Sequence, residues 1–160
     1  MQLLQFGLTR GNAAVSIPRG DGTRTSPPIH ARGRSSTYNA LAVAFGGAFG
    51  ALLRFGVYSV TERHIGKDFP YGTLTVNVLG GFLVGLLLTA AAEHLDMRPV
   101  LRKALIIGCL GGFTTFSAFA WDTLSLASGG NMTHALVNTA ANVLLALGAV
   151  WLGAIVGRSL

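Results

Sequence analysis

Four apolar stretches constrain the fold of this chain most strongly. They lie at about residues 39–60, 71–92, 104–126 and 134–157, and only Arg54 and Asp122 place a charge within them. Each is close to the roughly 20 residues that a helix needs to cross a hydrocarbon core of about 30 Å. The connections between them are short. The sequence therefore predicts an all-α membrane protein with four transmembrane helices, located as a multi-pass protein in a plasma or bacterial inner membrane.

Composition agrees with this class, since 51% of the 160 residues are hydrophobic and only 11% are charged. The formal net charge is +6. The basic residues lie in the first segment and in the connections, without the continuous basic face and aromatic residues of a nucleic-acid binder. We therefore expect no nucleic-acid partner. The single cysteine, Cys109, excludes an intrachain disulfide and a metal site built from several cysteines.

The first 37 residues differ from the rest of the chain, because they are rich in Gly, Ser, Pro and Arg. Such a composition buries too little apolar surface to fold. We expect residues 1–37 to form a disordered basic extension and residues 38–160 to form the transmembrane domain.

The charges that flank the spans give only a weak preference for one orientation. Four spans place the second loop and the C-terminus on one side of the membrane and the first and third loops on the other. Four cations fall on the first side and two on the second: Arg98, Arg102, Lys103 and Arg158 against Arg63 and Lys67. Because the positive-inside rule depends on this difference, a chain with so small a bias can insert either way round.

Polar residues inside spans cost free energy, so their positions indicate function. In the second span, Thr73 and Asn77 are four residues apart and share a helix face. In the fourth span, Asn138 and Asn142 repeat this spacing. The alternative is a packing seam in which these side chains only bond a neighbouring helix.

In the third span, Gly108, Gly111 and Gly112 precede the hydroxyl residues Thr114, Thr115 and Ser117. Adjacent glycines weaken a helix where hydroxyls can satisfy the freed backbone groups. We therefore expect this helix to be broken near its middle.

Aromatic and charged residues complete the pattern. Phe113, Phe116 and Phe119 recur every three residues and are expected along one side of the third span. A phenylalanine ring edge is electropositive and can face an anion, although ordinary packing is the common role. Arg54 is expected to reach the membrane interface rather than a central ion site, and Asp122 is expected near an interface. Amide and hydroxyl donors with few acids suit a small, strongly hydrated anion, and fluoride demands such donors most.

At these residues the sequence resembles the CrcB/Fluc family of fluoride channels, from about Gly46 to the C-terminus. The matching elements are GGAFGALLRF, YGTLTVNVLGGFLVG and GCLGGFTTFSAFAWD, followed by a fourth helix rich in small residues. The resemblance implies an antiparallel, dual-topology homodimer that exports fluoride passively and so lowers its toxicity in the cytoplasm.

The resemblance also implies roles for single residues. Pore-lining positions fall on Thr73 and Asn77, aromatic fluoride contacts on Phe116 and Phe119, a hydroxyl contact on Ser117, and a vestibule arginine on Arg54. A structural sodium ion at the dimer centre would be held by the backbone carbonyls of Gly111 and Thr114 from both subunits. Asn138 and Asn142 fall along the polar track of the fourth helix.

Some positions depart from the family pattern. Ala118 stands where threonine or serine is common, and Asp122 stands where glutamate is usual. The basic N-terminal extension is not part of the pattern, and it would favour one orientation, in which case an oppositely oriented paralogue would be the partner.

Three other functions remain open from the residues alone. A small four-span drug/proton antiporter needs a carboxylate within the membrane, normally in the first helix, where this chain has only Arg54. A hydrolase using Ser117 needs a base, and His134 is the histidine nearest a span. An assembly subunit without transport would tolerate loss of Asn77. We expect a channel and not an enzyme.

Overall fold

The structure, a computed structural model, describes residues 29–94 and 96–160. Most of the predicted extension, residues 1–28, lies outside the described residues. Within them, the segments that are long and apolar enough to cross a membrane are Ser36–His64, Tyr71–Glu93, Pro99–Ser128 and Met132–Arg158. The four predicted spans are thereby confirmed by length and composition.

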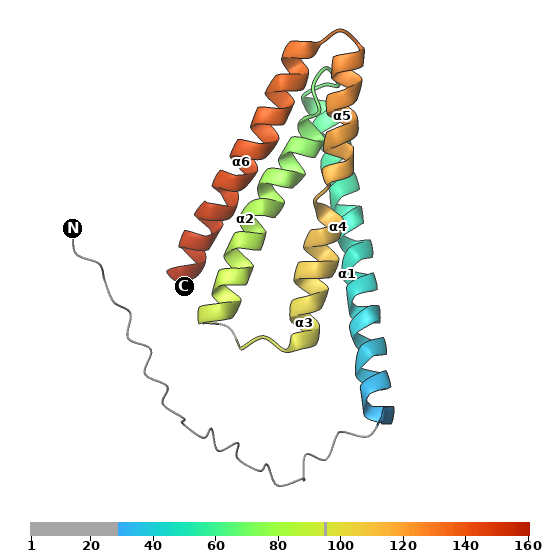
Figure 1. The fold of residues 1–160 in the computed structure, drawn as a ribbon, viewed down its shortest axis with the longest axis vertical. Helices are drawn as coiled ribbons and strands as arrows, with labels where there is room; N and C mark the ends of the chain where they lie inside the picture. The colour runs from blue at the N-terminus through green and yellow to red at the C-terminus, as the bar shows by residue number, and fades with distance from the viewer. Residues whose placement is uncertain (1–28, 95) are drawn as a thin grey trace, which may run out of the picture.

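The described chain is helical almost throughout (Figure 1). Its elements are α1 (Ile29–His64), α2 (Tyr71–Glu93), α3 (Pro99–Lys103), the π-helical segment η1 (Ala104–Leu110), α4 (Gly111–Phe113), α5 (Phe116–Ser128) and α6 (Met132–Arg158). The third span thus consists of α3, η1, α4 and α5 in succession.

The first helix begins earlier than the composition predicts. Residues 29–37, expected within the disordered extension, form the first turns of α1. In the sequence Pro27 and Pro28 stand immediately before this helix. Proline is common at helix starts because its missing N–H would have no partner inside the helix.

The helices run up and down, so that successive spans are antiparallel (Figure 1). The α1–α2 and α5–α6 connections lie at one end. Each contains a glycine with positive φ, Gly66 at 114° and Gly130 at 83°, a conformation that other residues rarely adopt. The opposite end carries α3, with its basic residues Arg102 and Lys103, and the C-terminus.

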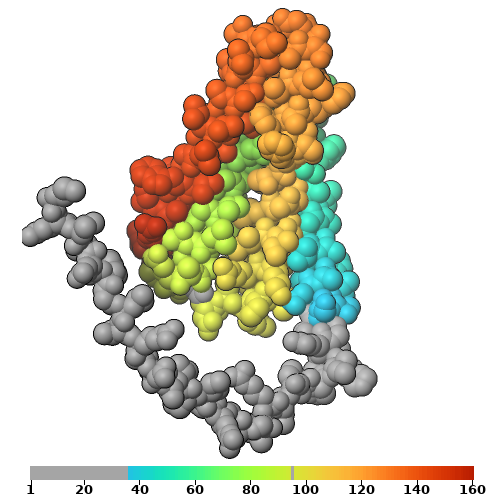
Figure 2. Space-filling model, in the orientation of Figure 1, coloured from blue at the N-terminus to red at the C-terminus, as the bar shows by residue number. Residues whose placement is uncertain are grey.

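Glycines allow two close helix pairs to form. One pair is α2 with α6, where a Cβ on Gly85 would collide with the carbonyl of Val150. The other joins α1 to η1 and α4, where a Cβ on Gly112 would lie 2.5 Å from the carbonyl oxygen of Gly47. Figure 2 shows α6 lying along α2 on one side of the molecule and the third span beside α1 on the other. Small residues permit such approaches in membranes, where packing drives helix association.

The backbone of the third span changes at Thr114 and Thr115. Gly111 and Gly112 are helical within α4, whereas Thr114 (φ −82°, ψ 159°) and Thr115 (φ −154°, ψ 121°) are extended. Helix α5 then begins at Phe116, and the Oγ1 of Thr115 accepts a hydrogen bond from the backbone N–H of Ala118 at 3.2 Å. Threonine, being β-branched, favours extended backbone and caps a helix start well. Gly112 therefore serves close packing on α1, and the threonines form the extended link.

A candidate ion site at the α4–α5 link

A pocket of about 350 Å³ lies beside the extended link. Four residues predicted for the fluoride pathway line it together, namely Asn77 from α2, Phe116 and Phe119 from α5, and Asn142 from α6. The remaining lining residues are Gly81, Val84, Thr114, Thr115, Val143, Ala146 and Val150. None of these lining residues is charged, so the pocket combines aromatic, apolar and amide surface in a membrane-spanning region.

Asn77 holds the backbone of Thr115 with both ends of its amide. Its Oδ1 accepts from the Thr115 N–H at 2.9 Å, and its Nδ2 donates to the Thr115 carbonyl at 3.1 Å. An extended residue in a span needs such partners, because unpaired backbone groups are costly where water is excluded. Asn77 thus stabilises the local conformation that separates α4 from α5.

The two asparagines of α6 continue from this contact. Asn77 Nδ2 also donates to Asn142 Oδ1 at 2.9 Å. Asn142 Nδ2 donates to the Oδ1 of Asn138 at 2.9 Å and to its carbonyl at 3.1 Å. Asn138 Nδ2 donates to Thr123 on α5 at 2.9 Å. The predicted shared face of Asn138 and Asn142 is confirmed, but Asn138 is fully buried and does not line the pocket.

The three phenylalanines do not share one side, so that expectation is wrong. Phe113 is buried against Gly80 of α2, whereas Phe116 is 77% exposed. The expectation assumed one continuous helix from Phe113 to Phe116. The extended link interrupts that helix, so the spacing of three residues no longer places the side chains on one side. Phe116 and Phe119 do pair, with ring centroids 5.4 Å apart and an interplanar angle of 58°.

Ser117 follows Phe116 and is exposed, with its hydroxyl 3.3 Å from that of Thr115. His134, considered as its catalytic base, packs instead near the ring of Phe69, with centroids 6.2 Å apart. A serine hydrolase would require Ser117 and His134 to contact each other. Ser117 instead lies beside Thr115, and His134 lies beside Phe69.

Arg54, expected to reach the membrane interface, is half-buried and contacts the third span. Its Nη1 lies 3.5 Å from the carbonyl oxygen of Thr114, at the start of the extended link. A half-buried cation is therefore held near the middle of the third span. Gly111, the other predicted carbonyl ligand, is exposed in α4, and the N–H four residues on, that of Thr115, donates to Asn77 instead.

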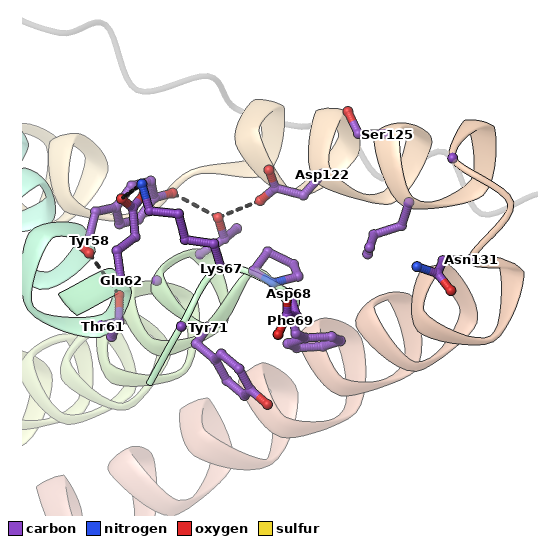
Figure 3. Close-up of a pocket in the computed structure, with 16 residues that line it drawn as sticks. Tyr58, Thr61, Glu62, Lys67, Asp68, Phe69, Tyr71, Asp122, Ser125 and Asn131 are labelled. Carbon is purple, nitrogen blue, oxygen red and sulfur yellow. Dashed lines mark hydrogen bonds and ion pairs between the residues drawn. The ribbon is translucent and has the colours of Figure 1, made fainter. Parts of the chain in front are cut away.

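Thr73 belongs to a second pocket, of about 360 Å³, below the α1–α2 and α5–α6 connections. Its hydroxyl donates to Asp122 Oδ2 at 2.6 Å (Figure 3). Because that donation uses its only hydrogen, the 2.9 Å bond to Tyr58 has the tyrosine as donor. Asp122 is therefore tied to α1 and α2 rather than lying free at an interface. Thr73 and Asn77 both face the third span, Thr73 at Asp122 of α5 and Asn77 at Thr115 of the link.

Sequence reasoning did not single out Tyr58 or Thr123 as site residues. Both are hydroxyl residues in otherwise apolar spans, and that is the only signal in the sequence. Their contacts join residues 15 apart along the chain, Tyr58 to Thr73 and Thr123 to Asn138. Only the packing of the helices reveals these pairings.

Comparison with known proteins places the chain among related sequences. The family profile described as "CrcB-like protein, Camphor Resistance (CrcB)" matches residues 41–154. A protein of Acidobacterium capsulatum named "Fluoride-specific ion channel FluC" is 44% identical over 74% of this chain and 94% of its own length. One of Allorhizobium ampelinum with the same name is 45% identical over 75% of this chain and 96% of its own.

A third relative with this name, from Methylococcus capsulatus, is 43% identical over 74% of this chain, and the match spans about half, 52%, of that longer protein. The profile covers most of the chain and includes both the extended link and the pocket residues. The chain is a multi-pass membrane protein, and it belongs to the CrcB-like family.

Proposed function

We propose that this protein is a fluoride-specific ion channel that exports fluoride passively and so protects the cytoplasm. The observation that carries the proposal is the uncharged pocket at the α4–α5 link, where Phe116 and Phe119 meet amide groups at membrane depth. This chain matches several relatives over nearly their whole length, and those relatives are named as fluoride-specific ion channels. Their names indicate that the ion is fluoride.

The chemistry of the pocket suits a small anion that must leave as easily as it enters. A channel has to bind its ion strongly enough for entry but weakly enough for exit. The edges of Phe116 and Phe119 are weakly electropositive. Ser117 follows Phe116 outside the pocket lining, and its exposed hydroxyl is a neutral donor. Arg54, held at the neighbouring link, raises the local concentration of anions.

The competing antiporter requires a carboxylate that exchanges protons along the path of a cation. Glu62, the acid within the first membrane-spanning segment, lies near its end and pairs with Lys67 at 3.2 Å. The carboxylate in the third span, Asp122, is bonded to Thr73. The relatives are named as fluoride channels, and this favours a channel over both an antiporter and an enzyme.

We propose that the working unit is an antiparallel homodimer of two oppositely inserted copies in a bacterial inner membrane. Phe116 is 77% exposed, and α1 exposes Phe45 and Phe49 on its outer surface. A second copy packed here would complete the wall beside Phe116. The family resemblance and the small charge bias of the spans support this arrangement.

A structural sodium ion at the centre of the dimer would be bound by the carbonyls of Gly111 and Thr114. Their chemistry fits, because hard cations prefer oxygen ligands and the extended link diverts the N–H groups of Thr115 and Ala118 from these carbonyls. Arg54 lies 3.5 Å from the Thr114 carbonyl, so sodium would displace this bond.

Replacing sodium with N-methylglucamine is expected to lower the melting temperature of the purified dimer. An ion present at about a hundred times its dissociation constant stabilises the folded state by about 2.7 kcal/mol. Potassium at equal ionic strength serves as the control. Identical melting curves in all three salts would contradict the sodium site.

Fluoride efflux from liposomes tests the proposed function. We expect rapid release of fluoride through the purified protein, recorded with a fluoride electrode, and little release of chloride under the same gradient. Empty liposomes and liposomes with a boiled sample provide the background. Absence of fluoride release from a dimer verified by size-exclusion chromatography would refute the channel.

A further inference from the structure

Hydrogen bonds at the pocket form a chain that runs in one direction. The donors and acceptors are, in order, Thr115 N–H to Asn77, Asn77 to Asn142, Asn142 to Asn138, Asn138 to Thr123, and the Thr123 hydroxyl to the Phe119 carbonyl. Each bond measures 2.8 or 2.9 Å. We call Asn77, Asn142 and Asn138 the amide ladder.

Backbone groups fix the direction of the ladder. An N–H can only donate, so Thr115 requires the oxygen of the Asn77 amide. A carbonyl can only accept, so the backbone of Asn138 requires the nitrogen of the Asn142 amide. The two requirements agree, because they leave Asn77 nitrogen facing Asn142 oxygen. Aligned bonds of this kind polarise and strengthen one another.

The ladder leaves its pocket-lining amides without a free donor. Asn77 gives its two N–H groups to the Thr115 carbonyl and to Asn142. Asn142 gives both of its N–H groups to Asn138. Asn142 is also only 5% exposed and Asn138 is 0% exposed. A fluoride ion, which needs donors in place of water, would have to break the ladder to bind these amides.

The ladder begins and ends on backbone groups that flank the aromatic pair. Its first donor is the Thr115 N–H, one residue before Phe116, and its last acceptor is the Phe119 carbonyl. Between these points it passes through α2 and α6. The first turn of α5 is therefore tied to both neighbouring helices, and the directions of the two rings depend on that attachment.

We propose that Asn77, Asn142 and Asn138 are positioning residues, which hold the start of α5 so that Phe116 and Phe119 face the ion, and that they do not bind fluoride themselves. This inference rests on the proposed channel function and concerns the same pocket. It assigns ion contact to the ring edges and the Ser117 hydroxyl. The role of the amides is to keep the pocket rigid.

Nuclear magnetic resonance on the full-length protein in lipid nanodiscs tests the inference directly. During titration with sodium fluoride against sodium chloride, the backbone resonances of Phe116 and Ser117 should shift saturably. The side-chain NH₂ resonances of Asn77 and Asn142 should stay unchanged. A saturable shift of these NH₂ resonances at the same fluoride concentrations would overturn the inference.

Variants at Asn142 test whether the amide ladder holds the start of α5. Asn142→Leu has a similar volume but cannot hydrogen-bond, so we expect fluoride flux to fall about tenfold, as for the loss of buried hydrogen bonds. The Thr115 N–H resonance, which Asn142 does not touch, should also move upfield. Asn142→Thr should restore the fluoride flux and the Thr115 N–H resonance, because its hydroxyl can donate to the Asn138 carbonyl and accept from Asn77.

Thr139→Val is the matched control, since Thr139 is exposed on α6 and bonds only the carbonyl of Ala135 within its own helix. It should retain wild-type flux and the wild-type Thr115 resonance.

Reduced flux in Asn142→Leu with an unmoved Thr115 resonance would overturn the positioning role. If the wild-type protein releases no fluoride, the proposed function fails, while the Thr115 resonance still decides whether the ladder holds the link. The sodium fluoride titration uses only the wild-type protein, so it still tests the inference if Asn142→Leu misfolds.

Discussion

Replacing Asn77 with aspartate is expected to lower fluoride flux about a thousandfold. The carboxylate has no donor for the Thr115 carbonyl or for Asn142, so it repels both acceptors and loosens the α4–α5 link. It also places a negative charge in the pocket that receives an anion. Two like charges about 4 Å apart at an effective dielectric constant of about 20 repel by about 4 kcal/mol, which corresponds to roughly that loss of rate.

The measurement is fluoride efflux from liposomes that contain equal amounts of assembled dimer. Thr133→Asp is the matched control, because it adds one carboxylate to the exposed first turn of α6, outside both pockets. A charge there is favourable near a helix N-terminus and should leave flux unchanged. Asn77→Asp with normal flux would argue against the assigned pocket.

Replacing Phe116 with isoleucine is expected to lower fluoride flux about tenfold and to reduce selectivity over chloride. The substitution removes one ring of the pair whose centroids lie 5.4 Å apart, and with it the electropositive edge that faces the pocket. Contributions of aromatic geometry reach about 1.5 kcal/mol, close to a factor of ten. Because Phe116 is 77% exposed in the single chain, the melting temperature should change little.

Phe55→Ile provides the comparison for this variant. Phe55 is 71% exposed on α1 and lines neither pocket, so the same loss of a ring should leave efflux unaltered. Flux and selectivity are measured with fluoride and chloride electrodes in paired liposome preparations. Equal fluxes in Phe116→Ile and Phe55→Ile would remove the aromatic contact from the proposed pathway.

Hydropathy and residue spacing predicted the four spans and the polar faces of two of them. Apolar length decides whether a helix can cross a membrane, and this property needs no tertiary contact. The spacing of four residues likewise places Asn138 and Asn142 in contact within one helix. The same rule correctly turned Thr73 and Asn77 toward a common neighbour, the third span.

Tertiary structure decided what those polar residues do. The glycines of the third span indicated a weak helix, yet they are helical, and Gly108 and Gly112 pack closely on α1. The backbone is extended at Thr114 and Thr115, where Asn77, 38 residues earlier in the chain, satisfies the freed N–H and carbonyl. Local propensity cannot anticipate a partner so distant in sequence, because it describes only neighbouring residues.

The directions of Phe113, Phe116 and Arg54 were decided in the same way. The extended link breaks the helical phase, so Phe113 turns inward and Phe116 outward. The Nη1 of Arg54 lies 3.5 Å from the Thr114 carbonyl oxygen, so the guanidinium points to the link. Sequence identifies polar groups that a membrane makes costly, and only the packed helices determine which of them satisfy one another and which remain for the ion.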